Sequence, residues 1–384
     1  MQKIGCIILA VCLLLAALPI GTYGAEPEVA GKSALLMDVA TGTVLYEKNA
    51  HEKLPPASVT KVMTLLLIME AIDSGCIGWN DMVTASEAAA AKGGSQIYLK
   101  VGETMPVTDL VKSIAVSSAN DAACAMAEYI AGSEAAFVDK MNEKAAALGM
   151  QDTHFVNCTG LDDDPNAESH LTSAYDIALM SRELMLHHPK IREFTTIWMD
   201  TIRSGSFGLA NTNKMVRFYP GCTGLKTGFT QKAGYCLSAS AEKDGLGLIA
   251  VVMGADSSQN RFNACKQLLD YGFANYALVR PELGESYEIP VTLGVSNKIT
   301  AVPAEDVKVL LDKAHKHSVT TEVVLEESLE APVSQGQKVG TLTVKAGDQV
   351  LRQVHMVAQA GVQRLTWGQI FAGLLRRITL RGGA

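Results

Sequence analysis

Three short motifs in a fixed order constrain this 384-residue chain more than any other feature. They are Ser58-Val59-Thr60-Lys61, Ser118-Ala119-Asn120 and Lys226-Thr227-Gly228. Together they supply a serine with an amine base beside it, a second hydroxyl with an amide, and a cationic strand next to a glycine. This set suits acyl transfer through a serine ester without a histidine. The order and spacing carry the interpretation, because Ser-x-x-Lys alone occurs by chance about once per chain, as at Ser240–Lys243.

The first motif stands at the start of an apolar helix. Pro55-Pro56 stops the chain just before Ser58, and residues 62–72 are apolar on nearly every helical face, which predicts a fully buried helix. Free backbone N–H groups at the first turn point toward developing negative charge. Lys61 lies one turn from Ser58, where desolvation favours a neutral amine that can take the hydroxyl proton. The alternative, a capping serine with a surface lysine, lacks an obvious solvent face.

The second motif precedes a helix expected through residues 122–130, within a helical stretch at 105–130. At the start of that helix, Ser118 is expected to relay a proton to the leaving amine, and Asn120 to hold the substrate amide. The alternative is a plain helix cap, since serine and asparagine are good at that.

The third motif opens a strand. Gly228 lets a substrate backbone lie close along that strand, and Lys226 with Thr227 can bind a carboxylate. Alone, Lys-Thr-Gly is an ordinary tripeptide, but here it comes just before a hairpin expected at 235–253.

The remaining pattern predicts an α+β fold. Residues 26–280 have strands at both ends and helices between, which predicts an antiparallel sheet covered by helices. The strands form a hairpin at 33–49 and the hairpin at 235–253, and a closing helix follows at 261–277. Short alternating runs separated by turns then predict a small all-β domain at 284–358.

Both termini suggest export and a membrane surface. Residues 1–25 have a lysine, a long apolar run and small residues, as in a cleaved signal peptide, the alternative being a retained anchor. Residues 361–384 space apolar side chains at helical intervals between arginines, which is typical of an amphipathic helix lying on a membrane; the alternative is a terminal helix docked on the protein. We therefore expect an exported protein attached peripherally to the outer face of the cell membrane.

Composition excludes several other classes. The net charge of −7 and a pI of about 5.7 give no electrostatic footprint for nucleic acid. Hydrophobic residues make up 48% and charged residues 19%, enough for a substantial core. The cysteines are scattered singly and no His-Glu-x-x-His occurs, so we expect neither a metal nor a cofactor. The disulfide state stays open.

Longer stretches around the motifs carry a resemblance. Leu54–Thr64, Gly93–Ile97 and Asn213 with Tyr219–Gly221 resemble the penicillin-binding serine D-alanyl-D-alanine carboxypeptidases of low molecular mass, and the match covers nearly the whole chain. Tyr219–Gly221, together with Lys226–Thr230, is similar to the sporulation-associated members of Gram-positive bacteria.

The resemblance implies a mechanism and its partners. Ser58 would attack the carbonyl between two D-alanines of a peptidoglycan stem peptide, with Lys61 as base. Backbone N–H groups of Ser58 and Phe229 would form the oxyanion hole, and Arg261 would attract the terminal carboxylate. β-Lactams would mimic the dipeptide and stall at the ester stage. The family's second arginine before the third motif is replaced near Thr212, with Arg217 nearby.

Two other functions stay open from sequence alone. A class A β-lactamase would carry Ser-Asp-Asn instead of Ser-Ala-Asn, and Glu168–Thr172 echoes its catalytic glutamate loop only in part. A catalytically inactive wall-binding scaffold is disfavoured because all three motifs are intact.

Overall fold

The computed structural model describes residues 27–163, 166–284, 286–315 and 318–372. Contacts divide the chain into two compact units that meet between Asn275 and Tyr276, and each has its own hydrophobic core. The predicted signal peptide and residues 373–384 of the predicted terminal helix lie outside the described residues. Within the described residues, no helix has the length and hydropathy needed to cross a membrane.

The first unit is built on a five-stranded antiparallel sheet with the order β2-β1-β9-β8-β7. The strands are β1 (Ser33–Asp38), β2 (Val44–Lys48), β7 (Cys222–Thr230), β8 (Gly234–Lys243) and β9 (Leu246–Ala255). Strand β1 pairs with β9, so the hairpin from the start of the unit and the hairpin from its end form one sheet. Because β7 is an edge strand, the third motif has no strand neighbour on one side.

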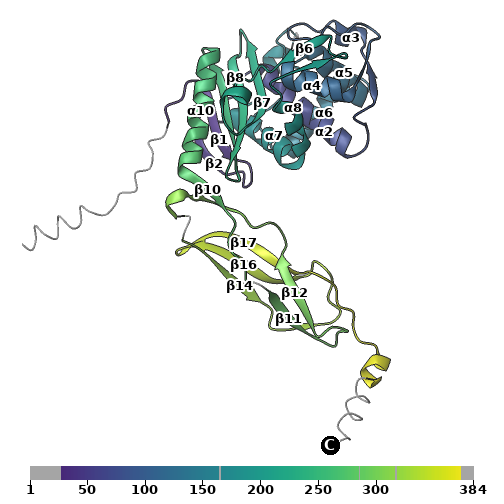
Figure 1. Ribbon diagram of the computed structural model, residues 1–384, viewed down its shortest axis with the longest axis vertical. Coiled ribbons are helices and arrows are strands. Elements are labelled where there is room, and N and C mark those ends of the chain that lie inside the picture. The colour runs from purple at the N-terminus through teal and green to yellow at the C-terminus, as the bar shows by residue number, and fades with distance from the viewer. Residues whose placement is uncertain (1–26, 164–165, 285, 316–317, 373–384) are drawn as a thin grey trace, which may run out of the picture. The chain divides into compact units, whose positions relative to one another are not determined.

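Helices cover both faces of this sheet (Figure 1). Successive side chains of a strand point to opposite faces. Accordingly, Gly272 of α10 (Ser258–Asn275) lies against Leu36 and Leu248, whereas Ser238 Oγ bonds Ser181 Oγ of α7 (Ala174–His187) at 2.8 Å from the other face. The side of α7 also holds the core built around α2 (Lys61–Asp73). The α+β class is confirmed.

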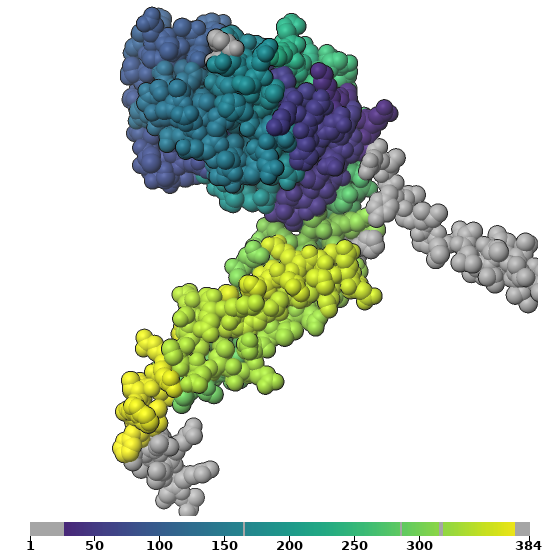
Figure 2. All heavy atoms as spheres, turned by 180° about the vertical axis from the view of Figure 1, so that it is seen from behind, coloured from purple at the N-terminus to yellow at the C-terminus, as the bar shows by residue number. Residues whose placement is uncertain are grey.

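The predicted buried helix is α2, preceded by the 3-10 turn η1 (Ala57–Thr60). Its residues 61–66, Ile68 and Met69 are buried, so the nearly all-round apolar pattern is explained by its central position. The segment before η1 is tied to the middle of the chain, since Leu54 pairs with Thr172. In the space-filling view, purple N-terminal residues accordingly lie against teal ones (Figure 2).

The helical stretch predicted at 105–130 consists of two helices preceded by a short strand. After β4 (Thr104–Pro106), the chain forms α4 (Val107–Ser117) and α5 (Asn120–Ala131), because Ser118 has a left-handed conformation with φ 63° that ends α4. The other elements of this unit are β3 (Met82–Thr84), α3 (Glu87–Ala90), α6 (Glu134–Ala147), η2 (Ala167–Ser169), η3 (Pro189–Ile191), α8 (Arg192–Thr195), β5 (Met199–Ile202), β6 (Phe207–Ala210) and α9 (Met215–Phe218).

The second unit is rich in strands, as predicted. A six-stranded sheet has the order β14-β16-β17-β12-β11-β15, and β10 pairs with β13. The strands are β10 (Tyr276–Val279), β11 (Tyr287–Thr292), β12 (Lys298–Pro303), β13 (Val309–Asp312), β14 (Val319–Leu325), β15 (Leu329–Glu330), β16 (Lys338–Ala346) and β17 (Gln349–Ala358), with the 3-10 turn η4 (Lys313–His315). The closing helix of the first unit ends at Asn275, before the predicted Ala277, because Tyr276 and Ala277 pair with β13.

Candidate active site

Ser58 and Lys61 lie in hydrogen-bond contact. Ser58 is in η1 and Lys61 begins α2, so one helical turn brings Lys61 Nζ to 2.9 Å from Ser58 Oγ. Nζ also donates to the carbonyl oxygen of Thr159 at 2.8 Å. Lys61 has no exposed surface. A nucleophile and a base at this separation meet the geometric requirement for general-base activation.

Burial changes the chemistry of Lys61. Desolvation lowers the pKa of its ammonium from 10.5 to about 7, against the opposing effects of Cys158 and Asp121, which favour the charged form. A large share of the side chain is therefore neutral near pH 7. The neutral amine has a free lone pair with which to accept the Ser58 proton.

A loop at residues 157–160 holds the lysine in place. Asn157 Oδ1 accepts the backbone N–H groups of Thr159 (3.1 Å) and Gly160 (2.7 Å), which orients the Thr159 carbonyl. Gly160 has φ +79°, and a Cβ there would lie 1.9 Å from the Ala57 oxygen, so only glycine allows this approach to η1. Sequence reasoning missed Thr159 because a backbone acceptor requires no particular side chain; Gly160 was the available signal.

The second motif lies at the break between α4 and α5. Asn120 begins α5, and its N–H and Nδ2 donate to the carbonyls of Ser95 and Gly93, both at 2.7 Å. Its Oδ1 is buried and has no hydrogen-bond partner among the described residues. Ser118 is 4% exposed. It ends α4 in a left-handed conformation and lies two residues before Asn120, the first residue of α5.

Asp121, the neighbour of Asn120, fixes the loop that contains Gly93–Ile97. Its carboxylate accepts N–H groups of Ile97 and Leu99 at 3.0–3.2 Å. It is also close enough to Lys61 to favour the protonated form of that amine. The negative charge of Asp121, next to the second motif, therefore acts on the lysine of the first motif.

The third motif packs directly on η1. A Cβ at Gly228 would lie 2.6 Å from the Pro56 oxygen and 3.1 Å from the Ser58 nitrogen, so β7 and the nucleophile's turn are in backbone contact. Lys226 is buried and donates to the Thr227 carbonyl at 2.8 Å. Desolvation, followed by the charges of Lys61 and Arg261, holds its pKa well below the ordinary lysine value.

Thr212, near which the resemblance would have a second arginine, lies beside the third motif. The Thr227 hydroxyl donates to Thr212 Oγ1 at 2.7 Å. Arg217 instead lies near two aromatic rings, with its guanidinium carbon 5.9 Å from the Trp198 ring and 5.8 Å from that of Phe218.

Arg261 supports β7 from α10. Its Nη1 donates to the carbonyl oxygens of Gly228 (2.9 Å) and Cys236 (3.4 Å), and only 7% of the residue is exposed. Burial lowers the pKa of this guanidinium. Phe229 is half exposed and its ring lies 4.3 Å from that of Tyr235. The structure thus packs the first motif against the third at the edge strand β7, with Arg261 bonded to Gly228, and the second motif adjoins Asp121, whose charge acts on Lys61.

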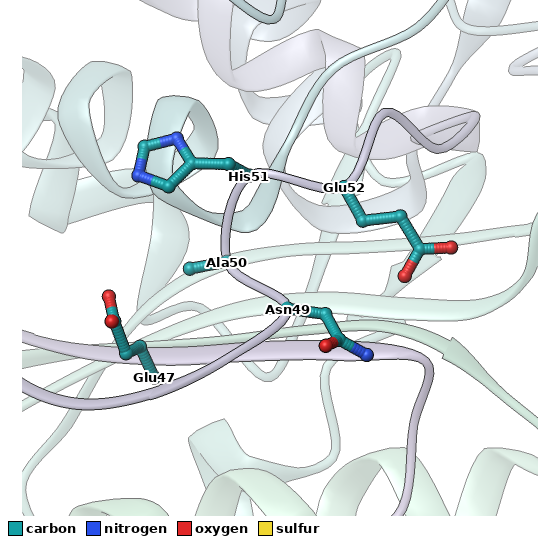
Figure 3. A pocket seen from close by; sticks show the side chains of 5 residues that line it. All are labelled: Glu47, Asn49, Ala50, His51 and Glu52. Atoms are coloured by element: carbon teal, nitrogen blue, oxygen red, sulfur yellow. The ribbon is translucent and has the colours of Figure 1, made fainter.

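A separate surface cavity carries no comparable arrangement. It measures about 570 Å³ and is lined by Glu47, Asn49, Ala50, His51 and Glu52. Figure 3 shows the carboxylates and the imidazole pointing in different directions. Throughout the described part of the chain, no cluster of three histidine, cysteine or acidic residues could hold a metal.

The first unit has the fold and site geometry of a serine acyl-transfer enzyme, with a fully buried lysine in hydrogen-bond contact with a serine. A family model described as D-alanyl-D-alanine carboxypeptidase matches residues 21–257, and one described as Penicillin-binding protein 5, C-terminal domain, matches residues 282–364. The D-alanyl-D-alanine carboxypeptidase DacF of Bacillus subtilis is 42% identical over 340 residues, which cover 87% of this chain and 86% of that protein.

Solved structures give the same result. Penicillin binding protein 5 from Haemophilus influenzae matches with a TM-score of 0.75 and 29% identity, over 88% of this chain and 99% of its own. The ampicillin-bound form of penicillin-binding protein D2 from Listeria monocytogenes matches with a TM-score of 0.59 and 33% identity, over 64% of this chain and 100% of its own. This chain belongs to the D-alanyl-D-alanine carboxypeptidase family. It is a serine carboxypeptidase of the cell wall, and neither a β-lactamase nor an inactive scaffold is favoured.

Proposed function

We propose that Ser58 is the nucleophile and Lys61 its general base in the removal of terminal D-alanine from peptidoglycan stem peptides. The observation that carries these roles is the 2.9 Å contact between Lys61 Nζ and Ser58 Oγ in a site where the lysine is fully buried. The neutral amine takes the hydroxyl proton as Oγ attacks the carbonyl carbon between the two D-alanines.

The tetrahedral oxyanion forms next to the start of η1. Backbone N–H groups of Ser58 and Phe229 stabilise it, and such a donor is commonly worth about 10²–10³ in rate. Collapse of the intermediate breaks the C–N bond, and Ser118 relays the proton taken up by Lys61 to the departing amine, so that both side chains regain their starting protonation state. Water then hydrolyses the ester and restores the Ser58 hydroxyl.

Substrate recognition uses the edge of β7. The buried, unpartnered Oδ1 of Asn120 accepts a substrate amide N–H, which supplies its missing hydrogen bond. Lys226 and Thr227 bind the terminal carboxylate, and the buried charge of Arg261 adds positive potential from behind Gly228. A bound carboxylate raises the pKa of Lys226, so binding favours its charged form.

β-Lactams enter the same site and leave a long-lived ester on Ser58. The relative from Listeria monocytogenes has been solved with ampicillin and with cefotaxime bound. A penicillin resembles the terminal dipeptide, and its opened ring stays attached and hinders the hydrolytic water.

The pH dependence of acylation tests the role of Lys61. Below its pKa of about 7 the amine is protonated and cannot accept the Ser58 proton. The second-order rate of acylation by fluorescent penicillin should therefore fall about tenfold per pH unit below pH 6 and level off above pH 8. A stopped-flow or quenched-gel series from pH 5 to 9 measures it. A rate constant that does not change across this range would contradict the assignment.

We also propose export and attachment to the outer face of the membrane through residues 361–384. Two aromatic side chains of this segment are open to solvent, Trp367 at 87% and Phe371 at 65% exposed, whereas Val362 is buried in the core of the second unit. Its arginines would each contribute about 1 kcal/mol at an anionic surface.

Vesicle sedimentation tests this attachment. The chain from residue 26 should bind vesicles rich in phosphatidylglycerol at low salt. Deletion of residues 367–384, which keeps Val362 and Arg364 in the fold of the second unit, should weaken binding by at least about tenfold. High salt should weaken it as well. Equal sedimentation of both chains would overturn the proposal.

A role in sporulation is a further proposal. It is supported by the resemblance of Tyr219–Gly221 and Lys226–Thr230 to sporulation-associated members, and by the 42% identity to the Bacillus subtilis relative. Deletion of the gene in its own bacterium should enrich uncleaved pentapeptide stems in the peptidoglycan of purified spores. A change confined to vegetative wall material would argue against this role.

A further inference from the structure

His170 is a buried histidine that the mechanism above does not use. It lies in the stretch Glu168–Thr172 and is 3% exposed. Its Nε2 is 2.8 Å from Thr60 Oγ1, and the backbone N–H of Val156 donates to its Nδ1 at 3.1 Å. The ring therefore connects a loop next to the site with the turn that carries the nucleophile.

The hydrogen bonds of His170 have a defined donor and acceptor at each step. A backbone N–H only donates, so Nδ1 of His170 is the acceptor and its ring proton is on Nε2. Nε2–H consequently donates to Thr60 Oγ1. The Thr60 hydroxyl is left to donate to the carbonyl oxygen of Ala57, which lies at 2.9 Å. The bonds thus run in one direction, from Val156 through His170 and Thr60 to Ala57.

Both ends of this chain of bonds hold parts of the site. Ala57 has φ +49°, a left-handed conformation that costs a non-glycine residue free energy and persists only where its surroundings hold it. Its carbonyl is the acceptor of Thr60, and Ser58 follows directly. At the other end, Val156 precedes Asn157, which orients the Thr159 carbonyl that binds Lys61.

We propose that His170 is a positioning residue that holds the turn carrying Ser58 against the loop whose carbonyl holds Lys61. In this role it acts on the reacting atoms through Thr60 and the loop at 156–160. It fixes the distance between nucleophile and base and keeps water away from the amine. This inference rests on the proposed roles of Ser58 and Lys61.

Three variants separate the two bonds of the imidazole. His170→Asn keeps an acceptor close to Val156 but loses the donor to Thr60, whereas His170→Gln keeps a donor near Thr60. Thr60→Val removes the hydroxyl at nearly constant shape. Acylation by fluorescent penicillin should slow about 10–100-fold in His170→Asn and Thr60→Val, since a displacement of about 1 Å can cost 10²-fold, and less in His170→Gln.

The pH profile supplies a readout that a purely structural role would not move. Loosening the turn admits water to Lys61, which raises its pKa, so the midpoint of the acid limb should rise above 7 in the slow variants. The double variant His170→Asn/Thr60→Val should be no slower than the slower single variant, because Thr60→Val already removes the bond to His170 together with the bond to Ala57. Additive losses would overturn the proposal.

His188 offers a matched control. It is also a buried histidine, 8% exposed, and its Nδ1 lies 2.5 Å from Asp73. His188→Gln should lower the melting temperature and leave the acylation rate and the midpoint of its acid limb unchanged.

The proposal is overturned if His188→Gln reproduces the His170 effects, or if both Thr60→Val and a folded His170→Asn stay within twofold of the wild-type acylation rate. Should His170→Asn not fold, Thr60→Val decides. If instead the proposed roles of Ser58 and Lys61 are wrong, the wild type would not be labelled by fluorescent penicillin, or the Ser58→Ala variant would still be labelled.

Discussion

Ser58→Ala should abolish covalent labelling by fluorescent penicillin and reduce D-alanine release by on the order of 10⁴-fold or more. The substitution removes the only atom proposed to form the ester, and Lys61 loses the hydroxyl 2.9 Å away to which it is bonded. Labelling followed on a gel, together with an assay of free D-alanine from a pentapeptide, measures both effects. On the wild type the label should persist for many minutes, because the ester with penicillin is proposed to hydrolyse slowly.

The second Ser-x-x-Lys sequence provides the control. Ser240 is buried in β8 and its hydroxyl bonds Thr223 at 2.8 Å, on a strand and not on a helical turn. Ser240→Ala should lower stability by about 1 kcal/mol and leave labelling intact. Labelling that survives in Ser58→Ala, or rapid steady-state hydrolysis of penicillin by the wild type, would contradict the assignment.

Lys61→Arg should slow acylation by about 10²–10⁴-fold, the usual contribution of a general base. Arginine has a similar reach but stays protonated at every accessible pH, so it cannot accept the Ser58 proton. Raising the pH to 9 should not restore the rate, in contrast to the wild type. Pre-steady-state labelling of the folded variant measures this difference.

Lys48→Arg is the matched control for this experiment. Lys48 donates to the carbonyl oxygens of Val29 (3.0 Å) and Gly31 (2.9 Å), contacts that arginine can also make, and it lies in β2. Its acylation rate should equal that of the wild type. A Lys61→Arg variant that acylates within tenfold of wild type would rule out a neutral amine as the base.

Much of the fold follows from local patterns in the sequence. The hairpins around Gly42 and Gly245, the buried helix after Ser58 and the change to short strands after residue 280 all depend on neighbouring residues, which periodicity and turn residues reveal. The fully buried Lys61 was predictable for the same reason, because its helix is apolar on nearly every face.

What the sequence did not show depends on contacts between distant segments. The left-handed conformation of Ser118, which ends α4 within the helical stretch predicted at 105–130, is not marked by a glycine. The Thr159 carbonyl acts through backbone, and the bond of His170 to Thr60 spans 110 positions.

The central claim is that Lys61 is largely neutral at physiological pH in the folded enzyme. Titration of the ¹³Cε resonance of Lys61 in lysine-labelled protein measures this directly, with the Lys61→Arg spectrum used to assign the signal. We expect the Lys61 resonance to titrate with a midpoint of about 7. A midpoint near the ordinary lysine value of about 10.4 would mean a protonated amine beside Ser58, and the proposed base would have to be another group.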